Sequence, residues 1–124
     1  FSDVPFTGEV EGKTKGSVKN GHWDGDFSEY WENGQLRSKG NYKDGKREGS
    51  WTEYWYYGEL SEKGTYQNGR LEGPWFRYYE NGQVMWIGNY KNGQLNGDFL
   101  GYTVDGFVDK NYTATYKNGV KVSD

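Results

Sequence analysis

Aromatic and glycine residues recur along this chain at a fixed step of 24 positions. The columns are Gly21, Gly45, Gly69 and Gly93; Gly25, Gly49, Gly73 and Gly97; Gly34, Gly58, Gly82 and Gly106; Gly40, Gly64 and Gly88; Tyr30, Tyr54, Tyr78 and Tyr102; and Tyr42, Tyr66 and Tyr90. Between these columns, apolar and polar residues alternate, and no helical period of about 3.6 is visible. The alternation predicts β-strands, and the short repeat predicts one β-hairpin per unit.

The repeats divide the chain into full units at 19–42, 43–66, 67–90 and 91–116, with partial units at 5–18 and 117–124. A chain of 124 residues is most simply a single domain. Because each unit is too short for a βαβ element, we predict an all-β fold. It is an elongated antiparallel meander of hairpins, with contacts mostly between neighbouring repeats.

The sequence ENGQ, at 32–35 and again at 80–83, predicts a tight turn at the end of a hairpin. Asn-Gly favours a type I′ turn, which needs positive φ at both central residues. We therefore expect two-residue turns at Asn33-Gly34 and Asn81-Gly82. The segments KDGKREG and QNGRLEG are expected to form looser loops between repeats.

Counting outward from these turns gives the expected cross-strand partners. They are Phe27–Gly40, Trp51–Gly64, Trp75–Gly88, Trp31–Leu36, Trp55–Leu60, Tyr79–Val84 and Arg77–Trp86. Because side chains alternate between faces, these rings should gather on one face and cover the bare backbone of the opposite glycines. Tyr30, Tyr54 and Tyr78 should lie on the other, more polar face.

The composition argues for a core made of rings. A mean hydropathy of -1.14 and 32% hydrophobic residues would suit a disordered chain. However, 19% of the residues are aromatic, and twelve Tyr, six Trp and six Phe are the main material available for burial. We expect Trp51, Trp55 and Trp75 to form core rather than a ligand platform.

The charge pattern argues against nucleic acid and anionic lipid as partners. The net charge is -3, and acidic and basic residues are mixed along the chain. No basic face is evident for nucleic acid or for anionic lipid headgroups. Without cysteine there is no thiolate metal site, and no cofactor is expected. The compartment stays open: a bacterial cytoplasm, or the cell envelope if a leader was removed before Phe1.

Two segments carry a family resemblance: YWENGQLRSKGNYKDGKREGSW at 30–51 and YYENGQVMWIGNYKNGQLNGDF at 78–99. They resemble MORN repeats, and more narrowly the bacterial MORN variant of YwqK-type antitoxin proteins. The resemblance covers residues 5–119, including the opening PFTGEV at 5–10. It implies a groove-bearing, rod-like all-β protein that mediates contacts, and the bacterial group is named for antitoxins.

Candidate catalytic groups are few. The single histidine, His22, lies in a predicted turn, where a surface role is expected. The predicted register places Glu53 opposite Glu62, and such a carboxylate pair can serve glycosidase chemistry. Like charges directly opposed are destabilising, but Arg77 in the next repeat can offset them, and the other repeats have no such pair. We therefore expect a structural pair and no enzyme.

Two functions remain after these exclusions. One is a protein-interaction or scaffold module, such as an antitoxin or immunity protein that binds a toxin. The other is a binder of glycans or cell-envelope ligands through exposed aromatic columns. Candidate binding residues are the tyrosine column and the places where the repeats differ: Tyr30, Tyr54, Tyr78, Met85, Trp86, Glu53 and Arg77. Exposed rings in a row would favour the glycan, and packed rings would favour a protein partner.

Overall fold

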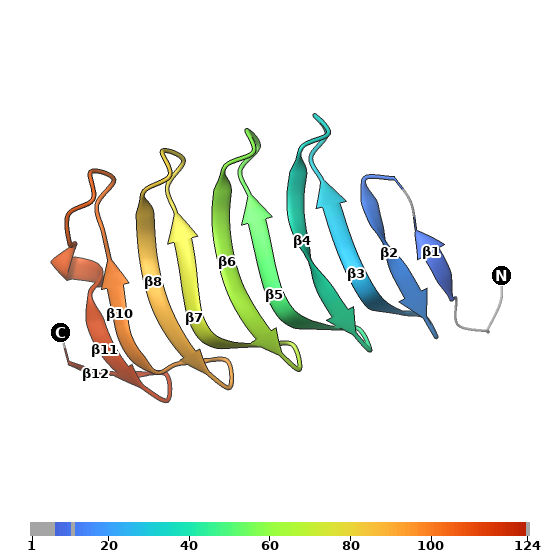
Figure 1. Cartoon of the computed structure of the whole chain (residues 1–124). Coiled ribbons are helices and arrows are strands. Elements are labelled where there is room, and N and C mark those ends of the chain that lie inside the picture. The colour runs from blue at the N-terminus through green and yellow to red at the C-terminus, as the bar shows by residue number, and fades with distance from the viewer. Residues whose placement is uncertain (1–6, 11, 124) are drawn as a thin grey trace.

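The computed structural model describes residues 7–10 and 12–123 and consists of one open antiparallel sheet (Figure 1). Consecutive strands pair with one another along its length, and β9 pairs with β8 beside this path. The strands are β1 (Gly8–Val10), β2 (Thr14–Lys19), β3 (His22–Tyr30), β4 (Leu36–Lys43), β5 (Lys46–Tyr54), β6 (Leu60–Gln67), β7 (Arg70–Tyr78), β8 (Val84–Lys91), β9 (Gln94–Leu95), β10 (Gly97–Gly101), β11 (Ala114–Lys117) and β12 (Val120–Ser123).

The predicted all-β meander is confirmed. A short 3₁₀ helix, η1 (Lys110–Tyr112), follows β10. No helix in the described residues is long and apolar enough to cross a membrane. Of the first partial unit, residues 5, 6 and 11 lie outside the described residues, so the part of PFTGEV before residue 7 is not placed.

The two kinds of turn are the reverse of those predicted. The tight two-residue turns join consecutive repeats, as at Asn68-Gly69, where φ is 52° and 81° and Gln67 pairs with Arg70. We call this edge of the sheet the turn rim. Its turns are Asn20-Gly21, Asp44-Gly45, Asn68-Gly69, Asn92-Gly93 and Asn118-Gly119. The loops expected to be loose are therefore the type I′ turns.

The ENGQ segments form three-residue loops instead. Gly34 N–H donates to the Trp31 carbonyl at 3.0 Å, and Trp31 N–H donates to the Gln35 carbonyl at 2.8 Å. Only Gly34 of the Asn-Gly pair has positive φ, at 86°. This is the loop in which a left-handed glycine closes a type I turn. Asn33 is used differently from our expectation, because its side chain accepts from Gln35 N–H at 2.9 Å.

The longer loop changes the register near the tips. Phe27–Gly40, Trp51–Gly64, Trp75–Gly88 and Arg77–Trp86 pair as predicted. Beyond them the partners of Leu36, Leu60 and Val84 are Tyr30, Tyr54 and Tyr78, so the pairs expected with Trp31, Trp55 and Tyr79 were wrong. An unpaired bulge residue, Arg37, Ser61 or Met85, offsets the extra loop residue in each hairpin. Leu36, Leu60 and Val84 therefore share the face of the tyrosine column.

The core is a layer of rings on one side of the sheet, which we call the aromatic face. Trp51 is 2% exposed and Phe27 is 8% exposed. Successive ring contacts join Trp23, Phe27, Tyr42, Trp51 and Tyr66 in one group, and Trp75, Trp86, Tyr90, Phe99 and Tyr116 in another.

The rings cover glycines of the neighbouring hairpin as well as their own partners. A Cβ built on Gly40 would overlap the indole of Trp51, which belongs to the following hairpin. Trp51 Nε1–H also donates to the Asn41 carbonyl at 3.1 Å. The nearest ring at Gly40 therefore comes from the following hairpin, whereas we expected it from the directly opposed Phe27. The contact across the β4–β5 boundary binds one repeat to the next.

Candidate functional site

The tyrosine column is not a bare row of rings. Tyr30, Tyr54 and Tyr78 are each half-buried. The Lys15 ammonium lies 5.3 Å from the centre of the Tyr30 ring. Phe76 stacks on Tyr78 with ring centres 6.4 Å apart. The face that carries them, which we call the tyrosine face, is only partly available to a ligand.

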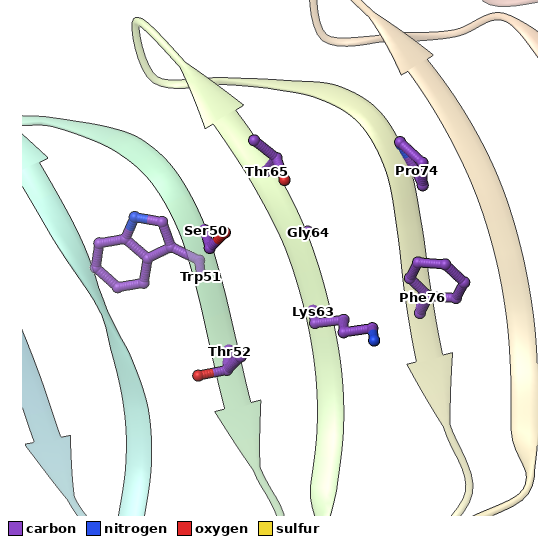
Figure 2. A pocket seen from close by; sticks show the side chains of 8 residues that line it. All are labelled: Ser50, Trp51, Thr52, Lys63, Gly64, Thr65, Pro74 and Phe76. Atoms are coloured by element: carbon purple, nitrogen blue, oxygen red, sulfur yellow. The ribbon is translucent and has the colours of Figure 1, made fainter.

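A shallow hollow of about 340 Å³ lies on the tyrosine face over β5–β7 (Figure 2). Figure 2 shows the Trp51 ring reaching over the neighbouring strand, while Lys63 reaches toward Phe76. The Lys63 ammonium lies 4.9 Å from the centre of the Phe76 ring, within the range of a cation–π contact. The rest of the lining is Trp51, Gly64, Pro74 and the hydroxyl-bearing residues Ser50, Thr52 and Thr65.

The acidic pair lies on the aromatic face, as the register predicted. Glu53 is directly opposite Glu62, which in turn is opposite Arg77. Arg77 Nη1 lies 2.9 Å from Glu62 Oε1, so the expected offset by Arg77 is present. Burial, together with the charge of Glu62 and a hydrogen bond to it, raises the pKa of Glu53 above its ordinary value. Glu53 is thus still repelled by Glu62, even though Arg77 pairs with Glu62.

A second polar cluster on this face was missed by the sequence analysis. Arg47 lies over the rings of Trp51 and Tyr66, at 4.2 Å and 5.3 Å from their centres. Burial disfavours its cation, but hydrogen bonds with Tyr42 and Tyr66 outweigh this and raise its pKa. Burial, then Glu62 and Tyr66, raises the pKa of Tyr90. The Tyr42, Tyr66 and Tyr90 column was visible as a repeat, and the Gly25–Tyr42 pairing would have assigned it to this face.

Both clusters consist of contacts between neighbouring strands. In one cluster Arg77 pairs with Glu62 across adjacent strands, and in the other Arg47 lies over the rings of Trp51 and Tyr66. His22 is exposed at a turn, as expected. Within the described residues, no group of three or more His, Cys, Asp or Glu is placed to hold a metal ion.

The edge opposite the turn rim is formed by the loops 31–35, 55–59, 79–83 and 103–107, which we call the tip rim (Figure 1). Large apolar side chains stand exposed on it: Tyr56 is 46% exposed, Tyr57 75%, Val104 49% and Phe107 72%. Sequence reasoning missed this surface, because these residues were considered only as parts of turns. The signal was present as apolar residues at loop positions that hold Glu and Asn in other repeats.

Hydrogen bonds join the tips in pairs. Between the first and second tips, Asn33 Nδ2–H donates to the Tyr56 carbonyl at 2.9 Å. Trp31 Nε1–H donates to the Tyr54 carbonyl at 3.2 Å. Between the third and fourth tips, Asn81 Nδ2–H donates to the Val104 carbonyl at 3.0 Å, and the Tyr79 hydroxyl donates to the Tyr102 carbonyl at 2.7 Å.

The second and third tips lack both of these bonds. Tyr57 stands where the first and third tips have Asn33 and Asn81, so the second tip has no side-chain amide at this position. In the described part of the chain, the indole N–H of Trp55 is buried without a hydrogen-bond partner. The tip rim therefore has a discontinuity at its centre.

A hollow of about 420 Å³, the tip hollow, lies next to this discontinuity. Its lining is Trp55, Tyr79, Glu80, Asn81, Met85 and Val104. Met85 reaches it from the bulge of β8. Its sequence neighbour Trp86 packs instead between Trp75 and Phe99, with ring centres 6.3 Å and 6.1 Å away. The two adjacent candidates thus have different environments.

Two segments of the chain, residues 23–44 and 71–92, match the family model described as MORN repeat variant. These two segments are therefore similar to MORN repeats, and together they cover less than half of the chain. Each match begins in the long first strand of a hairpin and ends at the first residue of a type I′ turn. The hairpin with Tyr57 lies between the two matched segments. No curated protein matches the chain.

MORN repeats are in general protein- or membrane-interaction modules, and the repeat is not an enzymatic unit.

Proposed function

We propose that this MORN-type chain is a non-enzymatic protein-interaction module that acts as an antitoxin or immunity protein by binding a toxin. One observation carries the proposal. The rings of the sheet pack on one another, whereas large apolar side chains stand exposed along the tip rim, where Tyr57 is 75% and Phe107 is 72% exposed. Four of the eight large apolar side chains that stand exposed in the described residues lie on this rim. The other four, Val108, Tyr112, Val120 and Val122, lie in the C-terminal segment 108–122. Neighbouring exposed apolar side chains of this kind are typical of a protein-binding surface.

The charge of the same edge suits a basic partner. Each tip contains an exposed acidic residue: Glu32, Glu59, Glu80 and Asp105. Charge complementarity of this kind speeds association and selects among partners. A toxin with a basic surface fits this requirement. Of the candidate residues, Met85 lines the tip hollow, and we propose that it contacts the toxin.

A second candidate function is supported by the tyrosine face. The half-buried rings of Tyr30, Tyr54 and Tyr78, with the hollow beside Phe76, offer partial platforms on which a glycan ring could stack. In either function, we propose that Glu53, Arg77 and Trp86 act mainly by supporting the sheet beneath the binding surface.

The test is co-expression with small proteins encoded beside the gene of this chain. We expect one of them to arrest growth when expressed alone, and growth to be restored together with a complex that stays intact in size-exclusion chromatography. A chain that binds no neighbour, yet is retained on a glycan array and loses retention in Tyr54→Ala, would replace this function with the glycan alternative.

A further inference from the structure

We infer that the tip rim is the docking surface for a basic protein segment, and that the tip hollow receives an apolar side chain from it. The inference rests on the proposed function in so far as the partner is a protein. It adds the place of contact and the chemistry of the segment that is recognised.

The first support is the break in the bonding pattern between the second and third tips. Between the first and second tips, and again between the third and fourth, an asparagine amide and a ring N–H or O–H donate hydrogen bonds to the next tip. Between the second and third tips the asparagine is replaced by Tyr57, and the indole N–H of Trp55 has no acceptor. A buried donor without an acceptor destabilises the free molecule. A partner that re-packs the hollow around Trp55 and supplies a carbonyl acceptor would remove this penalty.

The second support is the shape and composition of the tip hollow. Trp55, Tyr79, Met85 and Val104 supply apolar walls, and the polar groups of Glu80 and Asn81 lie at the same hollow. Methionine is unbranched and adapts to irregular ligands. At about 420 Å³ the hollow lies within the range of about 300–1,000 Å³ for ligand pockets. An inserted apolar side chain therefore fits this space, with its backbone near the acidic edge.

The third support is the opposite charge of the two rims. The tip loops contain Glu32, Glu59, Glu80 and Asp105 and neither Lys nor Arg. Among the described residues, Lys13 pairs with Glu32 at 4.0 Å, and no salt bridge is formed by the other three acids. The turn rim is instead flanked by six cations, Lys19, Lys43, Lys46, Arg70, Lys91 and Lys117, which outnumber the acids Asp24, Asp44, Glu48 and Glu72 at its turns. A basic segment is thus attracted to one rim and repelled from the other.

The single methionine of the chain provides a direct readout. Protein labelled with ¹³C in the methionine methyl group gives one resonance, and it comes from Met85 inside the hollow. We expect this resonance to shift in a saturable way when the capped peptide GKRLKRG is added at up to millimolar concentration. Peptide GKRAKRG, which lacks the apolar side chain, should bind about tenfold more weakly, a difference equal to about 1.4 kcal/mol. Peptide GEDLEDG should cause no shift, and added salt should weaken the first interaction.

Two substitutions test the site within the folded chain. Tyr57→Asn places an amide where Asn33 and Asn81 have theirs and removes the exposed ring, so it should weaken binding of GKRLKRG. Glu80→Gln removes a charge at the hollow and should reduce the salt dependence as well as the affinity. Lys91→Gln on the turn rim is the matched control and should leave the affinity unchanged. Urea unfolding of each variant verifies that the sheet is intact.

The inference is overturned if the Met85 resonance does not move, if all three peptides shift it alike, or if Tyr57→Asn and Glu80→Gln bind GKRLKRG like the unaltered chain. The two proposals fail separately. A toxin that binds the Tyr57→Asn, Glu80→Gln double variant at full strength would contradict the docking surface while leaving the proposed function in place. A peptide response without any partner among the neighbouring gene products would do the reverse.

Discussion

The two rims of the sheet are made by the same repeats, yet one is uniform and the other varies. On the turn rim, the first residue of every turn has φ between 51° and 53°. Each of the later turns also bonds to the hairpin before it, as Asn68 N–H does to Glu48 Oε1 at 3.1 Å. On the tip rim, the corresponding loops read WENGQ, WYYGE, YENGQ and TVDGF. Their inter-tip bonds are complete on both sides and missing at the centre.

We propose that this difference separates the residues that fold the sheet from those that recognise a partner. Residues of the turn rim are engaged with the preceding repeat, and substitution there should affect the stacking of hairpins. Residues of the tip rim contribute less to stacking at the centre, and three acids there take part in no salt bridge among the described residues. A surface that varies between otherwise similar repeats is where a partner can be distinguished.

The largest expected effect lies in the sheet that joins the two rims. Gly40→Ala should lower the free energy of unfolding by about 3 kcal/mol, since the new Cβ would overlap the Trp51 indole. Gly88→Ala is the matched control, because its Cβ would lie 3.3 Å from Phe99 and 3.4 Å from Leu95 and Trp75. Urea unfolding measures both. Equal losses at the two sites would show that ring cover does not bind neighbouring repeats as described.

On the turn rim, Glu48→Ala should lower the free energy of unfolding by about 1 kcal/mol. The substitution removes the acceptor that Asn68 N–H uses in the preceding hairpin. Glu48→Gln keeps an acceptor oxygen and should retain most of the stability. If the alanine variant is as stable as the unaltered chain, the side-chain bonds to the turn N–H groups do not stabilise the turn rim.

On the tip rim, we expect a substitution that increases the free energy of unfolding. Tyr57→Asn should raise the free energy of unfolding by about 0.5–1 kcal/mol, because the new amide can donate to the carbonyl of Glu80 as Asn33 does to Tyr56. Asn81→Tyr, the reverse change at the third tip, should lower stability by a similar amount. Thermal unfolding of both variants measures these changes in stability. A loss of stability in Tyr57→Asn would contradict the proposed discontinuity.

The smallest effect is expected at Glu53, beneath the tips. Its pKa is raised in the folded state, so the folded chain holds the proton more tightly and stability falls as pH rises from the ordinary glutamate pKa through the raised one. Glu53→Gln should therefore raise stability at neutral pH by about 0.2–1 kcal/mol. It should also remove part of the pH dependence of unfolding in this acidic window. An unchanged pH profile would mean that Glu53 does not carry the repulsion.

The repeat, the all-β class and most of the central register could be predicted, because glycine and aromatic columns fix which residues oppose one another. The tips could not. Asn33-Gly34 has the sequence of a type I′ turn, but the side chain of Asn33 instead bonds to Gln35 N–H and the Tyr56 carbonyl. The bond to the Tyr56 carbonyl depends on the neighbouring repeat, and turn preferences derived from local sequence do not include such contacts. The resulting bulge moved Met85 out of strict alternation and into the tip hollow.

The pairing of consecutive strands also fixes a distance along the tip rim. Strands in a sheet lie about 4.8 Å apart, so hairpins that follow one another place their tips at intervals of about 9.6 Å. An α-helix, which rises about 1.5 Å per residue, advances nearly the same distance in one heptad of seven residues. A straight helix lying across the tips would thus meet each of them with the same face, and the number of hairpins would set how many heptads are read.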